Sequence, residues 1–335
     1  MKELIKKLVE ISSPSGREDA IREAITEEVR DYVDELRVDA LGNLICMKKG
    51  KSGKKLLLDA HMDEIGVVVT HIDDKGFLRI DMLGGVSPYM LLGSRIIFES
   101  GACGIVSTEG ESAREAGEIM KNLDFDHIFV DIGASSKEEA EKLAPIGTFG
   151  TYDSKFRDLG EKLVSKSMDD RIACAILVQT IKELKEPADD VYFVFAVQEE
   201  VGIVGASVAA FDIMPDMAVA VDVTAGPDTP KSFKRMGFKL GAGPTIKIKD
   251  RGSVSSSRVV SRLKEVADIR SIPVQYEVLI FGGTDARGYQ ITGKGIAAGT
   301  VSVPTRYVHS PNEVVDYNDV LNTVRLLKAL AEEGV

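Results

Sequence analysis

Carboxylates and histidines gather at places in this chain where buried strands are expected to end. Glu199 and Glu200 directly follow the apolar and aromatic run 191–197, which predicts a strand buried on both faces. Ligands of open α/β sheets bind beyond the carboxyl ends of such strands. An acidic solvated loop is the simpler interpretation of two adjacent glutamates alone. Further candidate ligands, which favour a site instead, are His61, Asp63, Asp169, Asp222 and His309.

The chemistry that these residue types favour is the binding of divalent metal. Two histidines with several carboxylates, and no cysteine among them, suit Zn²⁺, Co²⁺ or Mn²⁺. Two ions a few ångströms apart need one bridging carboxylate and about two further protein ligands each. Asp169 as the bridge, with two histidines and two acids outside it, meets that requirement. Bound ions of this kind activate water for hydrolysis.

Each candidate ligand also has an ordinary structural interpretation. An isolated histidine is usually an ordinary polar residue, and His61 and His309 are two of only four in the chain. Asp169 could cap the helix that follows it, and capping does not exclude binding metal. Asp222 could be a loop acid. Asp63 could hold the imidazole of His61, a common arrangement around metals, or lie in a solvated turn.

The elements that must position these residues alternate between helices and short apolar strands. An amphipathic helix is expected over residues 1–12, and Ser15 with Glu18 predicts a capping box for the next helix. The stripe of Ala173, Leu177 and Ile181 predicts a helix directly after Asp169. Strands that lead into the polar segments are expected at 56–58, 217–221, 278–281 and 297–303.

The middle of the chain has a different residue pattern from its two ends. Short strands and glycines dominate residues 67–160, with a hairpin turn at 73–76 and one clear helix at 136–143. We therefore predict a β-rich domain of residues 67–160, inserted into an α/β catalytic domain of residues 1–66 and 161–335.

Charge and cysteine content indicate which partners and which cellular compartment to expect. The chain has 42 lysines and arginines against 53 aspartates and glutamates, and the net charge of −11 disfavours nucleic acid. We expect no signal peptide, because the N-terminal segment lacks an apolar h-region, and no run reaches membrane-spanning length. Three widely spaced cysteines are typical of a reducing cytoplasm. These features predict a cytoplasmic protein without nucleic-acid or membrane partners.

Taken together in this order, the polar segments resemble those of the M42 metallo-aminopeptidases. That family comprises glutamyl and deblocking aminopeptidases, and some members carry an endoglucanase label. The resemblance covers essentially the whole chain. The matching segments are 59–66, 168–171, 198–202, 221–224, 282–286 and 306–311.

The resemblance implies a function and a role for each residue. It implies hydrolysis of the N-terminal residue of peptides by two divalent ions, Zn²⁺ or Co²⁺. The implied roles are His61 and Asp222 on one ion, Glu200 and His309 on the other, Asp169 as bridge, Glu199 as general base and Asp63 as partner of His61. The implied fold is a mixed-sheet, phosphorylase/hydrolase-like α/β domain with an inserted β-barrel that makes dimer contacts. Homo-oligomers are expected, with dimers assembling into a dodecamer.

Three other functions remain as alternatives. A deacylase or carboxypeptidase could use the same ligands. A glycoside hydrolase could use Glu199 and Glu200, but side chains of neighbours on an extended chain point to opposite faces, whereas glycosidase carboxylates flank one bond. A non-catalytic metal-binding protein would need no spare base beside a ligand. The segment Ala225-Gly226-Pro227 departs from the family pattern. The sequence therefore does not define the substrate side of the site or the preferred N-terminal residue.

Overall fold

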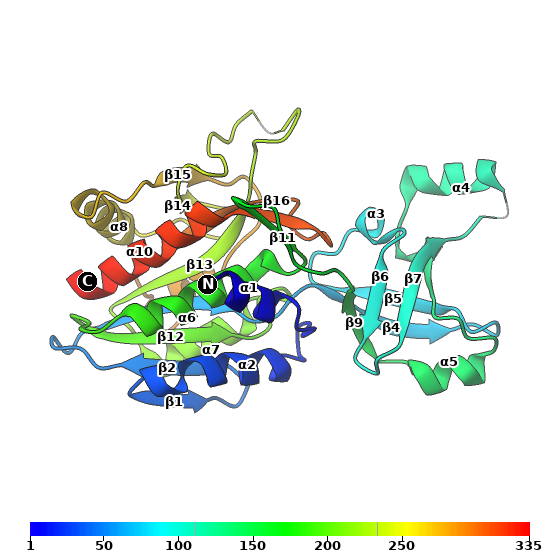
Figure 1. The fold of residues 1–335 in the computed structure, drawn as a ribbon, viewed down its shortest axis with the longest axis horizontal. Helices are drawn as coiled ribbons and strands as arrows, with labels where there is room; N and C mark the ends of the chain where they lie inside the picture. Colours follow the sequence, from blue (N-terminus) through cyan, green and yellow to red (C-terminus); the bar gives the residue numbers. More distant parts are fainter. Residues whose placement is uncertain (111, 233) are drawn as a thin grey trace.

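The computed structural model describes residues 1–110, 112–232 and 234–335. It confirms the predicted fold class, since a large mixed α/β unit carries a closed antiparallel barrel at one end (Figure 1). The barrel strands begin at Gly66 and end at Tyr152. The domain limits at 66/67 and 160/161 stay a prediction.

An eleven-stranded mixed sheet forms the centre of the α/β unit. Its main path runs β1-β2-β12-β3-β13-β16-β17-β11-β10, and β14 joins β16 to β15. The neighbouring pairs β12–β3, β3–β13 and β13–β16 are parallel, so their carboxyl ends share one edge. The strands are β1 (Glu35–Val38), β2 (Leu44–Lys48), β3 (Lys55–His61), β10 (Arg157–Asp158), β11 (Lys162–Ser165), β12 (Asp190–Ala196), β13 (Met217–Ala225), β14 (Thr245–Lys249), β15 (Gln275–Val278), β16 (Ala298–Arg306) and β17 (Glu313–Asp316).

Helices cover both faces of this sheet. One face packs against α1 (Lys2–Val9), α2 (Asp19–Val29), α6 (Met168–Glu183), α8 (Ser257–Ile269) and α10 (Tyr317–Glu333). The other face packs against α7 (Val204–Ile213) and α9 (Ala286–Ile291). Strand alternation divides the core accordingly: Leu56 and Leu58 face the first layer, and Leu57 faces the second.

The barrel has a hydrophobic core of its own. Its strands are β4 (Gly66–Ile72), β5 (Leu78–Leu83), β6 (Arg95–Phe98), β7 (Cys103–Thr108), β8 (Ile128–Asp131) and β9 (Phe149–Tyr152). The helix expected at 136–143 is α5 (Lys137–Leu143). The barrel unit also carries α3 (Pro88–Leu91) and α4 (Ala113–Ile119), two helices that we did not predict. Short 3₁₀ turns are η1 (Arg30–Tyr32), η2 (Met120–Asn122) and η3 (Phe125–His127).

Three local predictions were wrong. The strand expected at 278–281 ends at Val278. Asp222 lies within β13, which continues to Ala225, and does not follow its end. The capping box does not form, because the Ser15 hydroxyl donates to Asp63 and Glu18 itself occupies the N-cap position of α2. The Ser15 hydroxyl thus donates to a distant carboxylate and does not accept from the backbone N–H of Glu18, as a capping box requires.

Among the described residues, no helix combines the length and the hydrophobicity needed to cross a membrane.

Candidate metal centre

Two of the candidate ligands stand on the same face of the central sheet. In β13 the residues Val219, Val221 and Val223 face the large helical layer, so Asp222 points to the opposite face with Ala218 and Ala220. His61 is the last residue of β3, on the face that Leu57 shares with α7 and α9. Strand alternation thus brings an imidazole and a carboxylate to one edge of the sheet.

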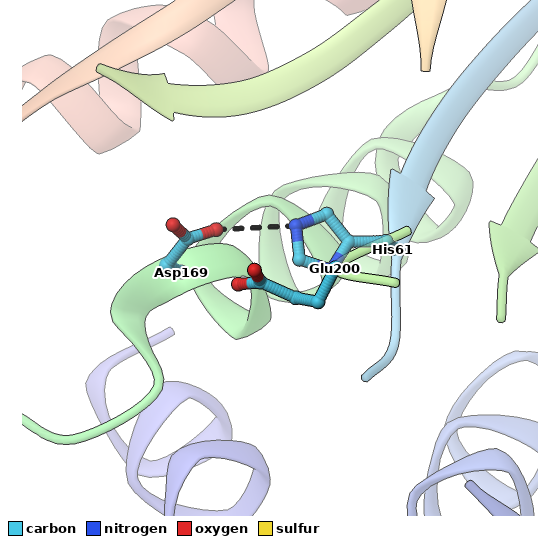
Figure 2. Close-up of side chains that lie close together, drawn as sticks. All are labelled: His61, Asp169 and Glu200. Carbon is cyan, nitrogen blue, oxygen red and sulfur yellow. Dashed lines mark hydrogen bonds and ion pairs between the residues drawn. The ribbon is translucent and has the colours of Figure 1, made fainter. Parts of the chain in front are cut away.

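Asp169 lies between two histidines. One of its carboxylate oxygens, Oδ1, is 3.1 Å from Nε2 of His61, and the other, Oδ2, is 3.3 Å from Nε2 of His309. Nε2 of His309 is also 3.1 Å from Oε1 of Glu200. Figure 2 shows the Asp169 carboxylate turned toward the His61 ring, with Glu200 beside both. The Asp169 side chain thus faces the two histidines, and the non-helical φ and ψ of Asp169 and Asp170 place the start of the regular part of α6 after them.

The tautomers of the two histidines favour a metal ion. Nδ1 of His61 is 3.1 Å from the Asp63 carbonyl oxygen, and Nδ1 of His309 is 3.0 Å from that of Gly85. A carbonyl oxygen only accepts, so each Nδ1 carries the proton and donates it. Nε2 of each ring is then the atom that faces the Asp169 carboxylate. A cation shared between imidazole nitrogen and carboxylate oxygen satisfies both groups, which is the usual arrangement of metal-binding histidines.

The electrostatics of the site also favour positive charge. Burial lowers the pKa of His309, but the charges of Glu200 and Asp169 outweigh burial and raise it to about 12. Burial and the charge of Asp169 raise the pKa of Asp222 to about 7. So many acids in one buried place destabilise one another, and a divalent cation is the group that relieves their repulsion.

Asp170 joins the site although we did not predict it as a ligand. Ligand atoms of His61, Asp169 and Glu200 lie within 4.8 Å of one another, and so do those of His61, Asp170 and Asp222. The Asp170 side chain is buried, and its Oδ1 has no hydrogen-bond partner among the described residues. The donor types and this orphan oxygen both fit a divalent metal. Its place directly after Asp169 was the available signal in the sequence.

Asp63 connects His61 to the segment that carries the glutamates. Its Oδ1 lies 3.3 Å from Nδ1 of His61 and accepts from the backbone N–H of Glu199 at 3.0 Å. Its Oδ2 accepts from the Ser15 hydroxyl at 2.7 Å and from the N–H of Glu200 at 3.2 Å. One buried carboxylate therefore fixes the ring of His61 and the backbone of both glutamates.

Glu313 performs a similar task on the other side of the site. Its Oε2 accepts from the backbone N–H of Asp169 at 3.0 Å, and its Oε1 accepts from that of His309 at 2.7 Å. The side chain is buried, at the start of β17. Glu313 thus fixes two candidate ligands from segments 140 positions apart. Glu313 was not predicted as part of the site, because nothing in its immediate neighbours in the sequence marks it.

The barrel contributes backbone to the site. Gly85, in the loop after β5, supplies the carbonyl oxygen that orients His309. A Cβ atom at this position would lie 2.5 Å from Nδ1 of His309, so glycine is required for this close approach. Among its described residues, the inserted unit provides no candidate metal ligand, yet it holds one in place.

Glu199 and Glu200 line the same cavity, whose volume is about 640 Å³. Glu199 is half-buried, and burial raises its pKa well above the ordinary value; His61 opposes this shift and Asp285 adds to it. Both glutamates lie in a turn after β12 and not on extended chain. The two side chains are therefore not constrained to opposite faces, as they would be on an extended strand.

Comparison with known proteins identifies the family. The model of the M42 glutamyl aminopeptidase family matches residues 42–326. The chain belongs to the M42 family. As a member it is a peptide hydrolase and a metal-dependent aminopeptidase, and the resemblance noted in its sequence is confirmed.

Relatives of this M42 enzyme match over nearly their full lengths. A protein named "Putative aminopeptidase" from Acetivibrio thermocellus is 49% identical, with 98% of this chain and 97% of the relative covered. The lysyl aminopeptidase of Pyrococcus furiosus is 39% identical, covering 99% of this chain and 96% of the relative.

Solved structures of similar proteins share the fold of this M42 enzyme. Aminopeptidase APDkam598 from Desulfurococcus kamchatkensis has a TM-score of 0.94 and 39% identity, covering 99% of this chain and 94% of its own. The TET1 peptidase of Pyrococcus horikoshii has a TM-score of 0.87 and 34% identity, covering 99% of both chains. A Thermotoga maritima structure titled endoglucanase has a TM-score of 0.83 and 33% identity, covering 98% and 97%.

Proposed function

We propose that this aminopeptidase uses a pair of divalent ions, Zn²⁺ or Co²⁺, bridged by Asp169, with Glu199 as general base. The observation that carries the proposal is the Asp169 carboxylate, whose two oxygens face two different imidazoles. A carboxylate placed in this way can bind one ion with each oxygen. His61 and Asp222 would hold one ion, and Glu200 and His309 the other.

The ions and the protein divide the chemistry between them. When bound, the ions supply Lewis acidity toward the scissile carbonyl and lower the pKa of water. Glu199 takes the proton of the attacking water and passes it to the leaving amine. Asp63 and Glu313 keep the ligand-bearing backbone segments in place. The surplus of carboxylates at the site binds the free α-ammonium group, which restricts cleavage to the N-terminal residue.

Hydrolysis of aminoacyl-anilides after chelation and readdition of Co²⁺ or Zn²⁺ tests the proposal. We expect activity on free amino-terminal substrates, no activity on N-acetylated analogues and none on cellulose. Faster release from N-acylated substrates would favour the deacylase, and release of C-terminal residues the carboxypeptidase. Hydrolysis of cellulose would favour the glycosidase.

We also propose that the enzyme is a homo-oligomer built from dimers. The P. horikoshii relative is described as assembling into a tetrahedron or a large octahedral shell. A closed shell of dimers needs two different contact surfaces. On α7 the apolar residues Val204, Val208 and Phe211 share one exposed face, and Ile291 on the adjoining α9 is 72% exposed. The barrel exposes Tyr89 and Met90. Exposed apolar groups of this kind are typical of interaction sites.

The assembly is expected to depend on metal. The proposed ligands come from several chain segments, so ions that bind only the ordered form stabilise it and the contacts that it makes. Light scattering at micromolar protein should show a large particle with saturating metal, a dodecamer by family analogy, and a smaller species after chelation.

The variant Phe211→Asp tests the exposed face of α7 separately from the exposed residues of the barrel. It should stop assembly at the smaller species without loss of metal, because a charge would be buried in the α7 contact. Ile269→Asp, on the exposed side of α8, is the matched control. A mass of one chain at saturating metal would show that the barrel assembles nothing.

A further inference from the structure

We infer that the cavity selects peptides whose N-terminal residue has a large, uncharged, apolar side chain, and that it disfavours basic ones. This inference rests on the proposed function, because it places that side chain in the same cavity as the metal ligands. Its basis is the wall of the cavity and the state of the one charged group in that wall.

Apolar groups form most of the wall beside the metal cluster. The lining residues outside the cluster include Ile203, Leu279, Phe281, Tyr307 and Val308. Leu279 is itself buried and packs in a small cluster with Met236 and Phe238. This part of the wall is therefore supported from behind, as a binding surface for an apolar side chain requires.

Lys247 is the only charged side chain among the described residues that line the cavity outside the metal cluster and Glu199. It is 1% exposed, and its Nζ lies 3.4 Å from Oε1 of Glu277. Glu277 is fixed in turn, since its two oxygens accept from the hydroxyls of Thr224 at 2.7 Å and Thr245 at 2.6 Å. The ammonium thus already has a buried, immobile counter-charge.

The sheet register explains why this pair is fixed. Lys247 stands directly opposite Glu277 on β15 and opposite Thr300 on β16. Alternation places both charged residues on the same face as Asp222, while Ile246 and Val301 face the apolar layer. The pair therefore belongs to the rigid sheet and is not a mobile arm available to pair with substrate.

The fixed Lys247–Glu277 pair determines how well each kind of substrate side chain binds. A lysyl or arginyl side chain would meet the Lys247 ammonium and, among the described residues of this wall, no unpaired acid, so its charge would be desolvated without compensation. A glutamyl side chain would have to compete with Glu277 for Lys247. An apolar side chain leaves the pair intact and gains from burial against Leu279 and Val308.

The cavity also has room for a large side chain. Gly282 and Gly283 line it without side chains of their own, and a Cβ at Gly283 would meet no atom within 4 Å. Gly282 has a φ of +68°, which favours glycine on conformational grounds. With a volume of about 640 Å³, the cavity accommodates leucyl, methionyl or phenylalanyl groups.

Comparison of leucyl-, methionyl-, lysyl- and glutamyl-p-nitroanilide on the Co²⁺-loaded enzyme tests the inference. We expect kcat/KM for the leucyl substrate to exceed that for the lysyl substrate by about 10²-fold, and the glutamyl substrate to fall between. Lysyl or glutamyl substrate equal to or better than leucyl would overturn the inference. If no anilide is cleaved, the proposed function has failed and a binding measurement decides on selectivity.

That measurement uses intact tripeptides and the metal-loaded Glu199→Gln variant. Calorimetry should show Leu-Gly-Gly binding at least about tenfold more tightly than Lys-Gly-Gly. Equal binding contradicts the inference, whatever the outcome of the activity assay.

Leu279 offers a matched pair of variants. Leu279→Asp places an acid in the wall, and Leu279→Asn is its uncharged counterpart of similar size. The Lys:Leu ratio of kcat/KM should rise at least about tenfold in Leu279→Asp relative to Leu279→Asn, because only the aspartate compensates a basic side chain. Equal ratios in two folded variants would show that Leu279 does not face the substrate side chain. If either variant fails to fold, the comparison of the four anilides on the wild-type enzyme still tests the inference.

Discussion

Replacing Glu199 with glutamine is expected to lower turnover by about 10²–10⁴-fold while the metal stays bound. Glu199 lines the cavity, but it belongs to neither group of potential ligands whose atoms lie close together. Its amide counterpart keeps the size of the side chain and loses the ability to accept a proton at the operating pH. Binding of metal should therefore survive, and proton transfer should not.

The neighbouring residue provides the control for this experiment. Glu200 lies 3.1 Å from His309, so Glu200→Gln should weaken metal binding and recover part of its activity at high metal concentration. Metal content by atomic absorption, measured beside kcat for both variants, separates the two roles. If Glu199→Gln loses metal and regains activity when metal is added, Glu199 is a ligand and the proposed general base is wrong.

Much of the fold was predictable because it follows from local rules. A run such as 191–197 has enough apolar and β-branched residues to be a buried strand wherever it lies, and it forms β12. Parallel neighbours then bring their carboxyl ends to one edge. This is why polar residues at or just after the ends of separate strands, such as His61 and Glu200, could be expected to meet.

The parts that were missed depend on contacts between distant segments. Glu313 acts on the backbone of Asp169 and His309, and backbone groups leave no mark in a sequence. Gly85 likewise contributes only a carbonyl oxygen. The capping-box prediction was wrong because of another contact between distant segments: the Ser15 hydroxyl donates to Asp63. Sequence patterns thus identify the residues that carry the chemistry more readily than the residues that hold those side chains in position.

The second large effect is expected at the proposed bridge, Asp169. Its two oxygens face Nε2 of His61 and Nε2 of His309, so it is placed to touch both ions. An asparagine there offers one carbonyl oxygen, presents an NH₂ donor on the other side and removes a negative charge. Asp169→Asn should therefore weaken both sites, by more than the 10–100-fold or so that loss of a supporting outer-shell partner costs.

Single-site variants provide the contrast that makes the bridge testable. His61→Ala removes a group that lies near Asp170 and Asp222, and His309→Ala removes one that lies beside Glu200, so each should mainly weaken one ion. Calorimetric titration of the chelated protein with Zn²⁺ should resolve two binding steps in the wild type. It should show one step weakened in each histidine variant and both weakened in Asp169→Asn. Two unchanged steps in Asp169→Asn would rule out the bridge, because a carboxylate that holds both ions cannot be neutralised without loss at both.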